Sequence, residues 1–186
     1  MPITLQGFHG TSYRNAKIIM HSSFNPSYGD EEWLGDGVYF FTKGLSNKPH
    51  KQAIEWAKAQ SWCKKAKTYL YKRIGVIKCD INVEEKNLLD LTTSDGVDLL
   101  NYIIECHSKK IKETGKKLSY IDGFVINFAR SENILPIEVV KGNVYIKFST
   151  ERINDIRRRT SNCTICAVND PSKNITSKSI ELTTTI

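Results

Sequence analysis

The chain has 186 residues, 40% of them hydrophobic and 25% charged, which suits one compact folded domain. No apolar stretch approaches the roughly 18 residues that a membrane helix needs, which excludes a bilayer-spanning protein. The first residues lack the basic start and apolar centre of a signal peptide, and the five cysteines lack disulfide-framework spacing. We therefore expect a cytoplasmic protein with free thiols that does not act at a membrane.

The net charge of +7 is unevenly distributed along the chain. Basic residues form three clusters: Lys64, Lys65, Lys67, Lys72 and Arg73; Lys109, Lys110, Lys112, Lys116 and Lys117; and Arg152, Arg157, Arg158 and Arg159. Such clusters attract polyanions, of which RNA and DNA are the obvious ones. A solvated face that keeps the protein soluble is an equal alternative, because the sequence shows no aromatic-interleaved nucleic-acid motif.

The first half of the chain alternates short predicted strands with helices. Residues 3–8 are predicted to form a strand, and Ser12 is predicted to cap the helix that follows. Residues 22–36 are rich in Ser, Asn, Pro, Gly and acids, which is typical of a loop. A β-rich run covers residues 38–42, and helical spacing of apolar residues begins at about Pro49.

The second half is predicted to contain more strands than helices. Residues 74–81 have the composition of a core strand, and an amphipathic helix begins at Asp95. Three later segments are predicted strands: residues 123–128, 137–148 and 164–168. Residues 177–186, full of Ser and Thr, are predicted to be a loose tail behind a single domain of residues 1–176.

The order of these elements indicates the fold class. Strands crowd both ends of the chain without a βαβ rhythm, which favours an α+β fold with antiparallel sheets over a doubly wound parallel sheet. No GxGxxG motif follows a strand, so a Rossmann site is not expected.

Two segments stand out as candidates for chemistry: residues 8–12, with the sequence FHGTS, and residues 33–41, with the sequence WLGDGVYFF. Each alone is ambiguous. A histidine at a strand end is usually structural, and Gly35 and Gly37 indicate only an unusual φ or a close backbone approach. An aromatic trio is by default part of a core.

A helix containing Ala53, Trp56 and Ala57 comes next in order. This combination resembles the catalytic domain of the diphtheria-toxin-like, PARP-like ADP-ribosyltransferases, specifically bacterial or phage-type members with the pattern HGT…WLGxGxYF…AxxWA. The similarity is specific over residues 8–57. A weaker similarity extends to residues 122–127, 138–142 and 164–171. The resemblance implies a split antiparallel β-sandwich core with flanking helices.

The resemblance also implies NAD⁺ as co-substrate and no metal. Transfer of ADP-ribose breaks the bond between nicotinamide and the ribose anomeric carbon through an oxocarbenium-like transition state, so catalysis consists largely of positioning and charge placement. His9 would hydrogen-bond the adenosine ribose, and the backbone of Gly10, with Thr11 beside it, would hold the carboxamide. Tyr39 would stack on the nicotinamide ring and favour its cationic form.

Four further positions complete the NAD⁺ site that the resemblance implies. Gly35 and Gly37 would let the backbone approach the ligand. Asn25 lies where the family's variable donor loop covers NAD⁺, and Trp56 lies on the adjoining helix.

One departure from the family pattern concerns its late-strand glutamate, which holds the ribose and activates the acceptor. Thr164 aligns with that position, and a threonine cannot act as a carboxylate base. Relatives without this glutamate are generally mono-transferases or inactive, so we expect no chain formation. Glu138 and then Glu151 are the candidate replacements. Alternatively, both are ordinary surface acids.

We therefore expect a mono-ADP-ribosyltransferase, acting as a toxin or defence effector, that modifies RNA, DNA or protein and is held in check by a neutralising antitoxin. One alternative is a non-catalytic module that binds NAD⁺, ADP-ribose or nucleic acid, with Thr164 as a degenerate triad residue. Another is an NAD⁺ glycohydrolase, and an RNA 2′-phosphotransferase ranks last. Cys163 and Cys166 form a CxxC without a second pair, so strand cysteines are expected there rather than a zinc site.

Overall fold

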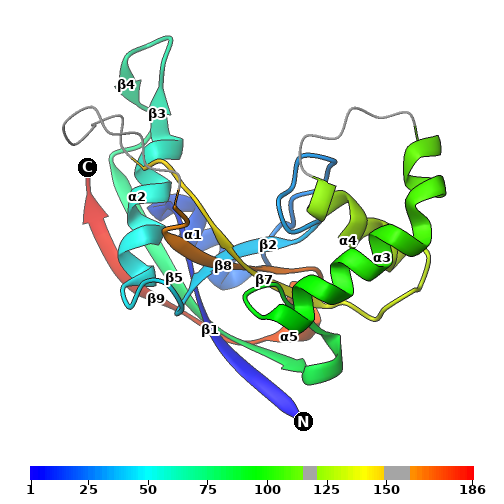
Figure 1. The fold of residues 1–186 in the computed structure, drawn as a ribbon. Coiled ribbons are helices and arrows are strands. Elements are labelled where there is room, and N and C mark those ends of the chain that lie inside the picture. Colours follow the sequence, from blue (N-terminus) through cyan, green and yellow to red (C-terminus); the bar gives the residue numbers. More distant parts are fainter. Residues whose placement is uncertain (115–120, 149–159) are drawn as a thin grey trace.

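The computed structural model describes residues 1–114, 121–148 and 160–186. It is a mixed α+β structure, built on one large, mostly antiparallel sheet with helices packed against it (Figure 1). The strand order is β6-β7-β8-β2-β1-β5-β9. Within the described ranges, β6 and β7 are parallel and the other neighbours in this sheet are antiparallel.

The strands of the large sheet are β1 (Pro2–Ser12), β2 (Val38–Thr42), β5 (Arg73–Glu84), β6 (Leu88–Asp90), β7 (Val139–Val144), β8 (Cys163–Val168) and β9 (Ile175–Thr185). A separate hairpin consists of β3 (Trp62–Cys63) and β4 (Thr68–Tyr69). The helices are α1 (Tyr13–His21), α2 (Pro49–Ser61), α3 (Ser94–Glu113), α4 (Ile121–Ser131) and α5 (Pro171–Asn174), with a 3-10 turn η1 (Glu85–Asn87). None of the described helices is long and apolar enough to cross a membrane.

The pairing between β1 and β2 is the shortest in the described part of the large sheet. The two strands pair only at Gly7 with Thr42 and at Phe8 with Phe41. Elsewhere β1 pairs with β5 along its whole length, and β2 pairs with β8 along its whole length. A fork therefore opens between β1 and β2 beyond Phe8, and residues of both strands border it.

Two apolar clusters pack the sheet, as the alternation of side chains along a strand requires. In β2, Val38 and Phe40 belong to one cluster, which also contains Ala16 of α1. Phe41 belongs to the other, which takes in buried residues of α2, α3 and α4. Both faces of β2 are therefore covered, and the strand is fixed in the middle of the sheet.

The structure confirms several sequence predictions near the fork. Ser12 caps α1, because its side chain accepts a hydrogen bond from the Asn15 amide at 3.1 Å. Strand β2 and the start of α2 at Pro49 agree with the prediction. Strand β1 is longer than the predicted residues 3–8, since pairing with β5 carries it on to Ser12.

The predicted strand over residues 123–128 is wrong, because this segment lies in helix α4. A short continuous apolar run is compatible with a buried strand or a buried helix, and periodicity alone cannot separate them. The helix buries Gly123, Val125, Ile126 and Ala129 on one side. Tertiary packing decided the conformation.

The loose tail predicted for residues 177–186 is also wrong. These residues form most of β9, which pairs with the outer edge of β5 from Ile175 to Thr185. Ile and Thr are β-branched and favour strands once a partner edge is available. The predicted domain boundary after residue 176 therefore falls inside a strand. The predicted strand over residues 137–148 is shorter in the structure, where β7 ends at Val144.

Deleting residues 177–186 tests the structural role of β9. We expect the free energy of unfolding to fall by at least about 3 kcal/mol, because several ladder hydrogen bonds, each worth about 1 kcal/mol, are lost. Urea denaturation of the full and truncated chains measures the change. Glu181→Ala, at an exposed position in a β-bulge of the same strand, is the control and should change stability by less than about 0.5 kcal/mol. Equal midpoints for the full and truncated chains would restore the loose-tail interpretation.

Candidate functional site

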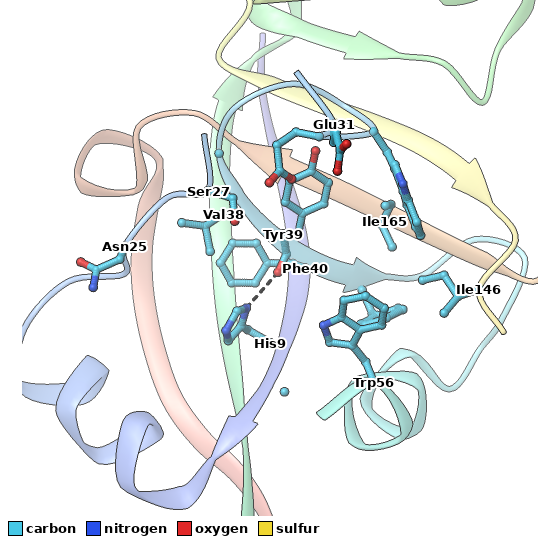
Figure 2. A pocket seen from close by; sticks show the side chains of 15 residues that line it. His9, Asn25, Ser27, Glu31, Val38, Tyr39, Phe40, Trp56, Ile146 and Ile165 are labelled. Carbon is cyan, nitrogen blue, oxygen red and sulfur yellow. Dashed lines mark hydrogen bonds between the residues drawn. The ribbon is translucent and has the colours of Figure 1, made fainter. Parts of the chain in front are cut away.

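A cavity of about 340 Å³ lies in the fork between β1 and β2 (Figure 2). Its lining comes from β1, the loop before β2, β2 itself, α2 and two isoleucines from the β7–β8 region. The lining residues are His9, Gly10, Asn25, Ser27, Glu31, Glu32, Trp33, Gly37, Val38, Tyr39, Phe40, Phe41, Trp56, Ile146 and Ile165.

His9 bridges the two strands where their pairing has stopped. Its Nδ1 lies 2.9 Å from the Tyr39 carbonyl oxygen, and because a carbonyl only accepts, Nδ1 must donate. Burial lowers the pKa of His9, although the Tyr39 hydrogen bond opposes this shift, so the ring is neutral near pH 7. Its Nε2 then remains an acceptor. Edge-on contacts with Phe24 and Phe40 fix the ring plane.

Tyr39 is held by the loop that precedes it. Its hydroxyl accepts from the Leu34 amide at 2.9 Å and donates to the Gly35 carbonyl at 2.8 Å. Burial raises the pKa of Tyr39 well above its ordinary value, so the phenol stays protonated. Gly35 has a φ of +76°, and a Cβ there would lie 2.6 Å from the Asn127 side-chain oxygen. The turn that positions the phenol therefore requires glycine.

Helix α4 fixes this loop through Asp36. The Asp36 amide donates to Asn127 Oδ1 at 2.8 Å, and Asn127 Nδ2 donates back to Asp36 Oδ1 at 2.9 Å. Arg130 Nη1 donates to the Asp36 carbonyl at 3.0 Å. Asn127 and Arg130 are thus positioning residues that the sequence reasoning missed. The available signal was a pair of polar residues three positions apart within an apolar run. That spacing places two side chains on the same side of a helix, whereas in a strand it places them on opposite faces.

Two acids of the loop, Glu31 and Glu32, also line the cavity and were not predicted. Figure 2 shows the Glu31 side chain on the side of the cavity where the Tyr39 ring lies. Burial, followed by the charge of Asp36, raises the pKa of Glu32, and the nearby hydroxyl groups of Ser27 and Tyr39 oppose this shift. The signal in the sequence is the acidic stretch within the loop, but acids are also ordinary in a solvent-exposed loop, so their composition alone does not place them in a cavity.

Helix α2 approaches β1 so closely that Gly10 has no room for a side chain. A Cβ at Gly10 would lie 1.9 Å from the Ala53 carbonyl oxygen. This close packing brings Trp56 to the cavity wall. Six of the predicted NAD⁺-site residues line the cavity: His9, Gly10, Asn25, Gly37, Tyr39 and Trp56. Thr11 and Gly35 do not.

Thr164, the predicted triad position, lies away from the cavity. It is fully buried, donates to Asn143 Oδ1 at 2.7 Å and accepts from the Leu45 amide at 2.9 Å. Ile165 is the β8 residue that lines the cavity. Neighbours along a strand face opposite sides, so Thr164 must face the other way.

Glu138 is also remote from the cavity. It accepts hydrogen bonds from Asn87 at 2.6 Å, Lys173 at 2.7 Å and Asn174 at 2.8 Å, and so joins η1, β7 and α5. Burial opposes ionisation of Glu138, but these partners outweigh it and lower its pKa. The structure therefore gives Glu138 a structural role. Glu151, the second candidate, lies outside the described residues.

Cys163 and Cys166 are buried, free thiols in β8, as expected for strand cysteines. Burial raises the pKa of Cys163 to about 11 and that of Cys166 to about 12, so neither is a thiolate at neutral pH. Among the described residues, no group of three His, Cys, Asp or Glu side chains is arranged to hold a metal ion.

Two of the basic clusters can be placed in the structure. The first surrounds the β3–β4 hairpin, and residues 109–112 lie in the last turns of α3. Lys116, Lys117 and the arginines at 152 and 157–159 lie outside the described ranges.

No family model matches the chain. An uncharacterised protein of the archaeon Methanocaldococcus jannaschii is 37% identical to it over 129 residues, which are 65% of this chain and 54% of that protein. The chain thus spans about half the length of this relative. The name of that protein states no activity.

Glu138→Ala separates a structural role from a catalytic one. We expect a loss of about 1–3 kcal/mol in the free energy of unfolding at pH 7, because the buried Asn174 side-chain amide loses one of its two acceptors and keeps only the Asn82 carbonyl. The folded-state pKa of Glu138 is lowered, so its stabilisation is complete above the unfolded pKa and disappears as the pH falls through the folded value. Urea denaturation of the wild type and the variant between pH 7 and pH 3 should show the two curves converging. A constant gap across this range would contradict the assignment.

Proposed function

We propose that this protein is an NAD⁺-dependent mono-ADP-ribosyltransferase. The observation that carries the proposal is the convergence of His9, Gly10 and Tyr39 on one cavity. These residues come from the two segments that carry the family resemblance, about thirty residues apart. The short β1–β2 pairing supports the split-sheet arrangement that the resemblance implies, with the ligand in the split.

The cavity has the chemistry to receive a cationic aromatic ring. The oxidised nicotinamide of NAD⁺ carries a positive charge, and aromatic faces attract such cations. Tyr39, Trp33 and Trp56 line the cavity together with the acids Glu31 and Glu32. The volume of about 340 Å³ lies in the ordinary range for small-molecule sites.

Each polar group has a distinct task in this proposal. A neutral His9 with Nδ1 committed to Tyr39 offers Nε2 as an acceptor for a ribose hydroxyl. Gly10 lines the cavity, and its backbone would hold the nicotinamide carboxamide against β1. Tyr39, anchored at its hydroxyl, presents its ring to the nicotinamide.

We assign the missing carboxylate to Glu32. In the transfer step, the bond between the anomeric carbon and the nicotinamide nitrogen breaks, and neutral nicotinamide leaves with the electron pair. A nucleophilic oxygen or nitrogen of the acceptor bonds to the anomeric carbon and loses its proton to a carboxylate. Glu32 lines the cavity, and its raised pKa suits a group that must take up this proton.

The direct test uses NAD⁺ labelled at the adenylate phosphate, with RNA, DNA or lysate protein as acceptor, and follows both label transfer and nicotinamide release. Acceptor-dependent release with labelled macromolecule supports the proposal. Release without an acceptor identifies a glycohydrolase. NAD⁺ binding without turnover identifies a binding module, and an absence of NAD⁺ binding contradicts the whole assignment.

Tyr39→Ala should weaken NAD⁺ binding at least tenfold and abolish transfer, because the ring contact and the anchor of the loop at Leu34 and Gly35 both disappear. Calorimetric titration with NAD⁺ measures the loss. Tyr39→Phe keeps the ring and should retain part of the affinity. The control is Tyr102→Ala, at a residue of α3 that is 64% exposed, and it should behave as wild type. Wild-type affinity in Tyr39→Ala would contradict the role of the ring.

Glu32→Gln should lower kcat roughly 100-fold or more and leave NAD⁺ affinity within a few-fold, as expected for loss of a general base. The pKa of Glu32 is raised, so wild-type activity should decline on the acid side at a higher pH than an ordinary glutamate would give. That decline should be absent from the residual activity of the variant. Turnover measured against pH tests both points, with the exposed Glu55→Gln of α2 as the matched control. Unchanged turnover in Glu32→Gln would exclude this assignment.

A further inference from the structure

The β3–β4 hairpin lies outside the large sheet, and the cavity does not involve it. Figure 1 shows it standing clear of the sheet beyond the C-terminal end of α2. Its two strands pair at Trp62 with Tyr69 and at Cys63 with Thr68, which leaves residues 64–67 as the tip. Three of these four tip residues are lysines, and residues 62–73 contain five basic residues and no acid.

The hairpin also carries exposed apolar side chains. Trp62 is 43% exposed and Leu70 is 70% exposed. The Trp62 ring meets the Tyr69 ring edge to face at 5.0 Å, which holds the indole in place and leaves part of it open to solvent. The structure thus places aromatic and basic side chains together, although the linear sequence showed no such motif.

The base of the hairpin is firmly attached to the helix. The Tyr71 hydroxyl donates to the Ala57 carbonyl at 2.7 Å, and the Leu70 amide donates to the Ser61 carbonyl at 2.7 Å. At the tip, Lys67 has a φ of +51°, a conformation that costs a non-glycine residue free energy. The turn therefore keeps a lysine where a glycine would be less strained.

We infer that this hairpin binds a single-stranded polynucleotide, which deepens the proposed function by naming the acceptor class. Flexible lysines contact phosphates without reading sequence, and an exposed, braced aromatic ring provides a stacking surface for a base. A positively charged element with a stacking aromatic is the combination that single strands require, whereas a duplex hides its base faces.

The position of the hairpin connects this surface to the cavity. Trp56 of α2 lines the cavity, and Trp62 begins the hairpin directly after the last residue of α2. Six residues of helix span about 9 Å, so a strand stacked on Trp62 lies within a few nucleotides of the cavity. This step alone rests on the proposed transferase activity. Binding by the hairpin does not.

The test measures binding of a fluorescein-labelled, unstructured twelve-nucleotide RNA by fluorescence anisotropy. The charge variant combines Lys64→Glu, Lys65→Glu and Lys67→Glu. We expect it to bind at least tenfold more weakly. The slope of log affinity against log salt should shrink by about 2, since each single-strand phosphate contact contributes about 0.7. Trp62→Ala should also weaken binding, roughly tenfold, but should keep the wild-type salt slope.

The matched control makes the same charge change elsewhere, with Lys109→Glu, Lys110→Glu and Lys112→Glu on α3. It should bind RNA within about threefold of wild type. Trp62→Phe keeps an aromatic face at this position and should bind RNA more tightly than Trp62→Ala, which separates stacking from folding. DNA of the same sequence should bind comparably, because neither contact reads the sugar.

NAD⁺ titration of every variant keeps the two proposals distinguishable. Normal NAD⁺ affinity with lost RNA binding supports the hairpin surface. The inference is overturned if the hairpin variants bind RNA as wild type does, if the α3 control loses as much affinity, or if a duplex binds more tightly than the single strand. Failure of NAD⁺ binding in the wild type, with hairpin-dependent RNA binding intact, would overturn only the transferase.

Discussion

Strands β1 and β2 share only two residue pairs, and the rest of the site depends on this short pairing. Where pairing stops, the His9 ring takes over by donating from Nδ1 to the Tyr39 carbonyl. A side-chain hydrogen bond thus takes the place of a backbone hydrogen bond between the two strands. The strands stay apart at this point, and the cavity occupies space that the backbone of a continuous sheet would fill. The long pairings of β1 with β5 and of β2 with β8 hold the two sides of this fork apart.

The loop over the fork is positioned by a different part of the chain. Asp36 is held by Asn127 and Arg130 of α4, about ninety residues later, and the glycine turn beside it fixes the Tyr39 hydroxyl. The acids that line the cavity belong to this same loop. The electrostatics of the cavity are set by the burial and the charges of this loop and not by a residue of a late strand. This is the physical basis for assigning the carboxylate to Glu32.

The sequence predicted the parts of the site that depend on local signals. The capping Ser12, the short strand β2 and the start of α2 follow from capping chemistry, β-branched and aromatic composition and helical spacing. The errors at α4 and β9 have a common cause. A short apolar run and a Ser/Thr-rich stretch have no strong intrinsic preference, so the available packing partner, a helix face or the free edge of β5, decides their conformation.

By itself, the sequence determined the α+β class, the mostly antiparallel sheet and the two segments that supply His9 and Tyr39. Only the tertiary structure decided which acids reach the cavity. It buried Thr164 away from the cavity and gave Glu138 three hydrogen-bond donors, two amides and one ammonium group. It also brought Glu31 and Glu32 to the wall of the cavity. Local propensity acts over a few neighbouring residues, whereas the surroundings of a carboxylate are set by strands and helices that are distant in the chain and meet only on folding.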